Sequence, residues 1–309
     1  MNKICVLGSI NMDLVLQIEN MPKVGETILS NGFEKIPGGK GANQAVAAKR
    51  SGASVYMISK IGKDDNGQLL LKKLIDDNIN TKYVLIDEKE PTGMAMIMVN
   101  KNGNNSIIVV PGSNMTINRE DIKASKEAII ESDILISQFE TPVDVTLDAF
   151  RIAKNLNKIT ILNPAPAKSI DDELLKYTDI IIPNETEAEL ITGVKVDDLE
   201  SAKVAASKII EKGVKFVIIT LGSKGAAIIS KNEAKIVDAF KVNAIDTTAA
   251  GDSFIGGLSS KLNTSELTFE NLIEAVRFGN KVSSIAVQRK GAQPSIPYLK
   301  EVLEVYKEN

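Results

Sequence analysis

The sequence predicts an α/β protein, a three-layer sandwich in which a central, mostly parallel sheet is covered by helices on both faces, with a small β-sheet lid beside it. Short runs rich in isoleucine and valine alternate with segments of helical periodicity, which is typical of a parallel sheet buried on both faces. Two pairs of short strand patterns, in residues 12–36 and 92–111, interrupt this alternation and are expected to meet as the lid. We therefore expect one domain over residues 1–309 with the lid segments inserted in it.

The same patterns give the order of the elements. The chain opens with a strand at residues 3–8, and the turn Lys101-Asn102-Gly103-Asn104 indicates a hairpin in the second lid segment. Lid strands are expected at residues 14–18, 27–29, 94–99 and 106–110. Body strands are expected at residues 55–61, 134–138, 159–162, 180–182 and 216–220, with a hairpin at 225–230 and 234–237. Helices are expected at residues 45–50, 66–77, 143–155, 185–192 and 200–211.

Composition excludes several classes of function. The net charge is −3, so no broad basic surface is expected to attract nucleic acid or a membrane. No apolar run reaches membrane-spanning length and the first residues lead into a strand, so we expect a cytoplasmic protein. The single cysteine, Cys5, lies in an apolar run and should be a buried thiol. The absence of histidine excludes Ser-His-Asp and Cys-His sites, and any metal must be held by oxygen, which suits Mg²⁺.

The stretch 246–254, Asp-Thr-Thr-Ala-Ala-Gly-Asp-Ser-Phe, is the strongest candidate for a site. Its small residues allow close approach to the backbone, and it opens a helix whose first amides lack internal partners. Such a turn can bind a phosphoryl group. Asp252 would repel that group unless it acts as the base that deprotonates an attacking hydroxyl, so a catalytic role is one interpretation. The other is that Asp252 only caps the helix.

Polar residues follow the first strand and precede the first helix. Asn11 and Asp13 fall at a strand end, where they would suit the hydroxyls of a polyol or only satisfy a local turn. Residues 38–41 are rich in glycine, which implies close backbone approach, and Asn43 adds an amide. The spacing matches neither a P-loop nor the dinucleotide fingerprint, since Gln44 stands where the third glycine would be.

Three later segments carry further candidates. Glu140 follows a strand at the same sheet edge as Asn11. Asn184 and Glu187 lie three residues apart at a helix start, where they could hold waters of a Mg²⁺ or form an ordinary helix cap. Residues 220–225 could wrap a nucleotide phosphate or be only a tight turn between strands.

Seven motifs together resemble the ribokinase, or phosphofructokinase-B, family of carbohydrate kinases. They occur in the family's order and span nearly the full chain, which makes the set specific although each motif alone is weak. Met12, Phe139 and Ser253 are minor departures from the family's usual residues. The motifs are GSINMD (8–13), GGKGANQ (38–44), QFETP (138–142), NETE (184–187), TLGSKG (220–225), DTTAAGDSF (246–254) and RKGAQPS (289–295).

The resemblance implies a role for each matching position. The implied base is Asp252, and the implied anion hole is formed by the amides of Ala249, Ala250 and Gly251. The implied sugar-binding set is Asn11, Met12, Asp13, Gly39, Lys40, Gly41, Ala42, Asn43 and Glu140, together with Asp252. The implied ATP contacts are Asn184, Thr220, Leu221, Gly222, Ser223, Lys224, Gly225, Gly251 and Asn280. Glu187 is implied to order Mg²⁺ through water, and a monovalent cation, usually K⁺, is implied at Asp246, Thr248, Ala286, Arg289, Gly291 and Ser295.

The implied activity is ATP-dependent phosphorylation of D-ribose at its 5-hydroxyl. Related kinases for deoxyribose, fructose phosphate or a nucleoside are the alternatives. No extra arginine lies near Asn11 or Gly39 in the sequence to bind a phosphate, which argues against a sugar phosphate as the acceptor. A non-catalytic sugar-binding protein on the same scaffold is a further alternative. An exposed apolar face on the lid would favour a homodimer through edge-strand pairing.

Overall fold

The computed structural model describes residues 1–307 and is built around one nine-stranded sheet. The strands follow the order β13-β12-β11-β10-β9-β8-β1-β4-β5, and all pairs from β11 to β5 are parallel, while β12 and β13 are antiparallel. Their bounds are β1 Lys3–Leu7, β4 Ser54–Gly62, β5 Asn80–Asp87, β8 Ile134–Ser137, β9 Ile159–Leu162, β10 Ile180–Ile181, β11 Phe216–Thr220, β12 Ala226–Ile229 and β13 Ala234–Val237.

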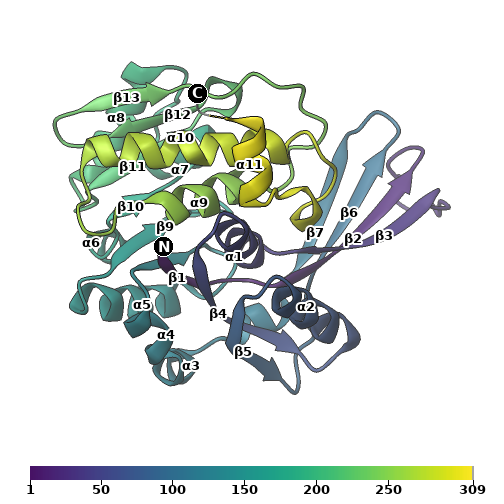
Figure 1. Cartoon of the computed structure of the whole chain (residues 1–309). Helices are drawn as coiled ribbons and strands as arrows, with labels where there is room; N and C mark the ends of the chain where they lie inside the picture. The colour runs from purple at the N-terminus through teal and green to yellow at the C-terminus, as the bar shows by residue number, and fades with distance from the viewer. Residues whose placement is uncertain (308–309) are drawn as a thin grey trace.

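Helices cover both faces of this sheet, as Figure 1 shows. Alternation along β1 explains why both faces are apolar: Ile4 and Val6 belong to one buried cluster, and Cys5 and Leu7 to the other. One face carries α1 Lys40–Arg50, α2 Asp65–Asp76, α9 Ala250–Lys261 and α10 Phe269–Ala286, against which α11 Leu299–Val305 packs. The other carries α3 Arg119–Ala124, α4 Lys126–Glu131, α5 Val143–Asn155, α6 Asp172–Lys176, α7 Glu185–Thr192 and α8 Leu199–Ile210. The predicted three-layer sandwich is confirmed.

The two lid segments meet as a separate four-stranded sheet, as predicted, and Figure 1 shows it projecting from the body. Its order is β3-β2-β6-β7, with β2 Asn11–Ile18, β3 Gly32–Gly38, β6 Gly93–Asn100 and β7 Asn105–Val110. The prediction of a strand at residues 27–29 is wrong, because the second strand of the first lid segment is β3, which begins at Gly32. β3 contains Pro37, which is tolerated there because β3 lies at the edge of its sheet and one side of an edge strand needs no hydrogen-bond donor.

The sheet order creates a crevice beside β1. From β1 the chain builds β4 and β5 on one side, and later returns to β8 and its successors on the other side. In open α/β sheets the loops at the carboxyl ends of the strands diverge at such a switch point, and ligands bind there. Gly8 to Asn11 follow β1, and Gln138 to Glu140 follow β8, so the polar strand ends singled out in the sequence meet at this crevice.

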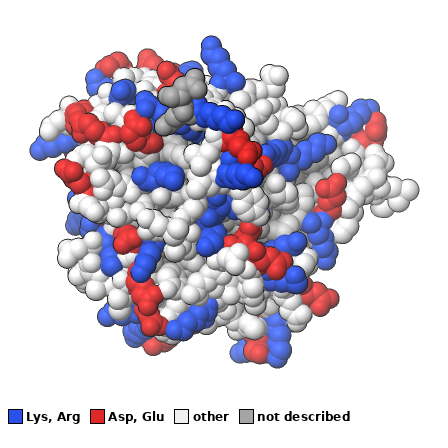
Figure 2. All heavy atoms as spheres, viewed as in Figure 1, with Lys and Arg blue, Asp and Glu red and all other residues white. Residues whose placement is uncertain are grey.

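Burial and surface charge agree with the composition. Cys5 is a free, fully buried thiol, and burial raises its pKa. Figure 2 shows Lys and Arg interspersed with Asp and Glu over the visible face, so neither sign of charge dominates there. Within residues 1–307, no helix combines the length and apolar character needed to cross a bilayer.

Candidate active site

The anion turn lies at the start of α9. Ala249 is the residue before the helix, with a left-handed φ of 58°, and no side chain caps this end. Asp252 is the third residue of α9, so the alternative that it serves as the N-cap is wrong. The amide of Ala250 donates to Thr247 O at 3.1 Å, whereas in the described chain the amides of Ala249 and Gly251 have no protein acceptor. A Cβ built on Gly251 would meet nothing within 4 Å, so space for an anion is open beside these amides.

Two side-chain amides hold the Asp252 carboxylate, which is only 7% exposed. Asn43 Nδ2 donates to Asp252 Oδ2 at 3.0 Å. Gln44 Nε2 donates to Asp252 Oδ1, also at 3.0 Å. Both donors come from the first turns of α1, so the glycine-rich segment and the anion turn, more than 200 residues apart in the chain, form one site.

Glu140 fixes the start of α1. The helix begins after Gly39, whose φ is 89°, and has no capping side chain of its own. Glu140 Oε2 instead accepts the backbone N–H of Lys40 at 3.0 Å, and Ser9 Oγ donates to the same oxygen. A carboxylate at this position is favoured by the helix dipole. Glu140 therefore lies at the predicted sugar site and also holds the loop that forms it.

The start of α1 also approaches the end of β1 very closely. A Cβ at Gly41 would lie 2.6 Å from Gly8 C and from Ser9 N, which are backbone atoms that cannot move aside independently. We expect Gly41→Ala to lower the free energy of unfolding by about 1–3 kcal/mol or more. The same substitution should weaken sugar binding, because it displaces the backbone at the predicted sugar site. Thermal unfolding and sugar saturation kinetics measure the two effects. Gly251→Ala is the matched control for stability, because its Cβ enters open space; equal stability of the two variants would contradict the expectation.

Asn11 and Asp13 lie at the start of β2, where this lid strand leaves the body and Asn11 pairs with Gly38. Asn11 Oδ1 accepts from Asn114 Nδ2 at 2.7 Å, and Asn114, which the sequence analysis missed, also accepts the Ile10 N–H at 2.9 Å. Burial raises the pKa of Asp13 to about 7, and the charges of Glu140 and Asp252 add to this effect.

Not every residue of the predicted sugar set presents its side chain to the site. The side chains of Met12 and Ala42 are fully buried in the apolar core. Ala42 also donates its N–H to Ser9 O at 2.9 Å. Only the backbone of these two positions could face a ligand.

Lys40 lies among carboxylates. Burial lowers the pKa of its ammonium group, but the charges of Asp252, Glu140 and Glu187 outweigh burial, and the pKa is raised. Lys40 lines a cavity of about 190 Å³ together with Glu187, Gly251 and Asp252. The Lys40 side chain therefore lines the cavity beside the anion turn, while its backbone N–H binds Glu140.

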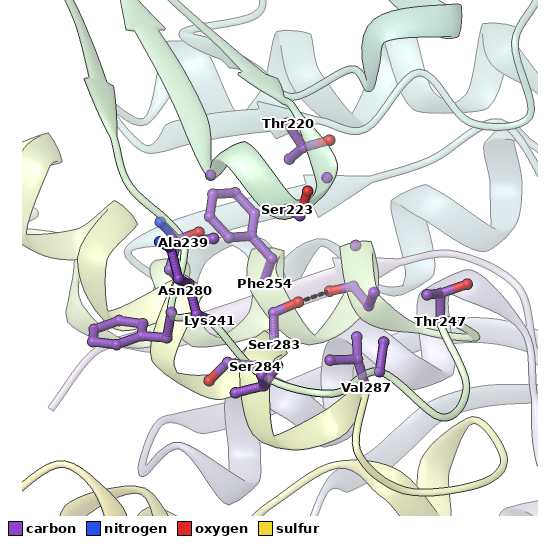
Figure 3. Close-up of a pocket in the computed structure, with 17 residues that line it drawn as sticks. Thr220, Ser223, Ala239, Lys241, Thr247, Phe254, Asn280, Ser283, Ser284 and Val287 are labelled. Carbon is purple, nitrogen blue, oxygen red and sulfur yellow. Dashed lines mark hydrogen bonds between the residues drawn. The ribbon is translucent and has the colours of Figure 1, made fainter.

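A second, larger cavity of about 430 Å³ adjoins the first, and the two share Thr220, Thr247, Ala250 and Gly251 as lining. Figure 3 shows Thr220 and Ser223 on one side, Asn280 and Ala239 across from them, and the Phe254 ring between. The predicted nucleotide residues Thr220, Gly222, Ser223, Gly225 and Asn280 all line it.

Two residues of the predicted nucleotide set point elsewhere. Leu221 is buried in the core, and Lys224 Nζ donates to Asp197 O at 2.9 Å. The segment is also a tight turn, since Leu221 N–H donates to Gly225 O at 2.8 Å. The two interpretations of residues 220–225 are therefore compatible: a tight turn presents Thr220 and Ser223 to the cavity.

Asn184 and Glu187 form a helix cap at the start of α7. Asn184 Oδ1 accepts the Glu187 N–H at 2.8 Å, and Glu187 Oε2 accepts the Asn184 N–H at 2.9 Å. Both also line the smaller cavity, and burial raises the pKa of Glu187. No group of three or more acidic or cysteine side chains that could hold a metal occurs among residues 1–307. A Mg²⁺ here would fit as Mg²⁺ binds in kinases, through one carboxylate, phosphate oxygens and water.

The predicted monovalent-cation positions lie on the anion turn and at the end of α10 and the loop after it, segments that hydrogen bonds connect. Asp246 Oδ1 accepts the Thr248 N–H at 2.8 Å, and Asp246 Oδ2 accepts the Gly291 N–H at 2.9 Å, which ties the anion turn to the loop after α10. Against the effect of burial, these bonds lower the pKa of Asp246. Ala286 O accepts the Arg289 N–H, and Ser295 Oγ donates to Ala292 O, so these positions are engaged in local turns.

An open amide turn with a buried carboxylate one residue beyond it is suited to phosphoryl transfer to an alcohol, and on this α/β fold it points to a kinase. Comparison with protein-family models makes the class specific. The model of the pfkB family of carbohydrate kinases matches residues 1–299, and the chain belongs to this family.

Individual relatives resemble the chain over its full length. A ribokinase of Staphylococcus aureus is 46% identical over 305 residues, covering 98% of this chain and 99% of the relative. A ribokinase of Haemophilus influenzae is 46% identical over 97% of this chain and 96% of its own length. The solved structure of Arabidopsis thaliana ribokinase complexed with ribose and ATP has a TM-score of 0.91 and 33% identity, covering 100% of this chain and 99% of the other.

Proposed function

We propose that this kinase transfers the γ-phosphoryl group of ATP to the 5-hydroxyl of D-ribose, giving D-ribose 5-phosphate and ADP in the cytoplasm. One observation carries the proposal: the Asp252 carboxylate is held between the sugar-side residues of α1 and the open amides of the anion turn. The names of the full-length relatives support ribose as the acceptor. The polar set at Asn11, Asp13 and Asn43 contains no basic side chain that would hold a phosphate, and its hydrogen-bonding groups suit the hydroxyls of an uncharged sugar.

In this proposal each residue has one task. Asn11, Asp13 and Asn43 bind the hydroxyls of ribose and orient its 5-hydroxyl toward Asp252. Asp252 accepts the proton of that hydroxyl as its oxygen attacks the phosphorus. The amides of Ala249 and Gly251 donate to the oxygens of the transferring group, where charge is spread in the transition state.

The cavities and charged residues suggest where the nucleotide and ions would lie. The larger cavity would hold the nucleoside and the smaller one the phosphates, with the Lys40 ammonium beside them. Glu187 would hold Mg²⁺ through water, and Mg²⁺ supplies neutralisation of phosphate charge. Asp246, Thr248 and Gly291 are the positions best arranged to take part in a K⁺ site behind the anion turn.

The test is an ADP-release assay over a panel of acceptors with and without K⁺. The panel contains ribose, deoxyribose, fructose 6-phosphate and a nucleoside at equal concentrations. The proposal expects the highest kcat/KM for ribose and activation by K⁺. A higher kcat/KM for another acceptor would reassign the substrate, and calorimetric ribose binding without ADP release would indicate a binding protein instead.

We also propose that the chain forms a homodimer through the lid. The edge strand β7 exposes Ile107, Ile108 and Val109, each more than half accessible, and Phe33 is exposed on β3. An unpaired edge with apolar side chains is a surface on which a second copy can pair.

Sedimentation tests the dimer. The unmodified chain should sediment as a dimer at micromolar concentration, and Ile107→Glu should shift it to the monomer because a charge would be buried in the interface. Leu190→Glu is the control, since Leu190 is equally exposed but lies on α7, outside the lid. Loss of the dimer in both variants, or in neither, would argue against pairing through the lid.

A further inference from the structure

Behind Asp252 lies a buried chain of three side-chain amides for which the proposed mechanism has no role. Gln44 Nε2 donates to Asp252 Oδ1 at 3.0 Å and to Asn163 Oδ1 at 3.1 Å. Gln138 Nε2 donates to Gln44 Oε1 at 2.7 Å. Asn163 Nδ2 in turn donates to Ile182 O at 3.0 Å. The chain therefore links α1, the end of β8 and the end of β9 to the carboxylate on α9.

The hydrogen bonds of Gln44 leave it no N–H for a substrate. Its amide has two N–H groups, and both are used inside the protein, on Asp252 and Asn163. Gln44 is fully buried, as is Gln138. If the Gln44 amide turned over, its oxygen would face the oxygens of Asp252 and Asn163, and its N–H groups would face Gln138 Nε2. The N–H toward Asp252 is therefore fixed by the protein.

Asn43, the other donor to Asp252, is less constrained. Its Oδ1 is buried and has no partner among the described residues, so the Asn43 amide has hydrogen-bonding capacity left for a ligand. If Asn43 shifts toward the sugar, Gln44 remains the fixed contact of the carboxylate.

The charged neighbours of Asp252 include acidic groups. Asp13 and Glu187 have charges that oppose that of Asp252, and Lys40 has a charge that attracts it. Carboxylates that share a site disfavour one another's ionised form and its orientation toward a common point. A neutral N–H donor stabilises the ionised carboxylate without adding a charge that would compete for the phosphoryl group.

We propose that Gln44 is a positioning residue: it holds the Asp252 carboxylate ionised and aimed at the sugar hydroxyl, and Gln138 and Asn163 fix its orientation. This inference rests on the proposed function, because it requires Asp252 to act as the base. Gln44 itself touches neither substrate.

Gln44→Met is the first test, because methionine has a similar length and volume but no donor. We expect kcat with ribose to fall about 10- to 100-fold, with KM for ATP unchanged. The acidic limb of the kcat–pH profile should move to higher pH by about one unit, since an N–H donated to a carboxylate favours its ionised form. Gln44→Glu, which is isosteric, should move the limb further, because two adjacent carboxylates share one proton.

Thr146→Val is the matched control. Thr146 is fully buried, and its hydroxyl lies 3.0 Å from Ser137 Oγ, next to Gln138 in the chain but away from Asp252. The Thr146→Val variant should have a lower free energy of unfolding but an unchanged acidic limb in its kcat–pH profile. A wild-type profile in both Gln44 variants would overturn the proposal, and so would a lower kcat with an unmoved limb, which would show a purely structural role. If Asp252→Asn retains turnover, the base assignment itself fails; if Asp252→Asn is inactive and the Gln44 variants have normal profiles, only this inference fails.

Discussion

Asp252→Asn is expected to lower kcat for ribose by about 10²- to 10⁴-fold, because it removes the general base while keeping the shape of the side chain. Binding of ATP should change little, since the amides of the anion turn remain, and ribose should still bind through Asn11 and Asp13. The measurement is steady-state ADP release, with calorimetric binding of each substrate to the same preparation. A kcat within tenfold of the unmodified enzyme would rule out the base assignment.

The structure explains why this variant should fold. An asparagine at position 252 brings one N–H₂ group where the carboxylate accepted two bonds, so one donor must yield. Gln44 is held by Asn163, whose own amide donates to Ile182 O, so the new amide oxygen would face Gln44 Nε2. Asn43 can turn over, because its Oδ1 is unpaired and would accept from the new N–H₂. An unchanged thermal unfolding midpoint would confirm that the lost activity is chemical.

The large sheet could be predicted because its strands are continuous apolar runs, which indicate burial on both faces without knowledge of their neighbours. Two strands were not predicted where the structure has them, each for its own reason. β5, Asn80–Asp87, was missed because this edge strand carries polar residues along much of its length. β3 was placed too early because Pro37 and its glycines argue against a strand, and only its edge position, a property of the assembled lid, makes them acceptable.

At the site, the sequence indicated residues that lie in motifs but not the contacts between them. Asp252 was identified by its place beside a run of small residues, yet its rejection as a helix cap required the backbone of Ala249. The hydrogen bonds from Gln44 to Asp252 and Asn163 join segments about 210 and 120 residues apart, respectively, and no local spacing encodes them. Asn114, which orients Asn11, follows the second lid segment and has no motif of its own.

Asp13→Asn should raise the KM for ribose at pH 8 by about 10- to 100-fold, because hydrogen bonds to a charged acceptor are stronger than those to an amide. Burial, and then the charges of Glu140 and Asp252, raise the pKa of Asp13 to about 7. In the unmodified enzyme the ionised fraction therefore falls about tenfold between pH 8 and pH 6, and KM for ribose should rise to match. The Asn variant should lose this dependence. An unchanged KM at pH 8 would show that Asp13 does not bind the sugar.

The same substitution should stabilise the free enzyme, and the sign follows from the pKa of Asp13. From about pH 4 to pH 7 the folded chain keeps the proton on Asp13 and the unfolded chain releases it. The free energy of unfolding contributed by this group therefore falls as pH rises through that window and is lowest above pH 7. Asp13→Asn removes the ionisable group, so its unfolding midpoint should exceed that of the unmodified chain at pH 8 and approach it near pH 4. If the variant at pH 8 binds ribose less tightly and also has a lower unfolding midpoint, Asp13 supports the fold. A gain in stability with a loss of binding would mean that the buried charge is retained for the sugar.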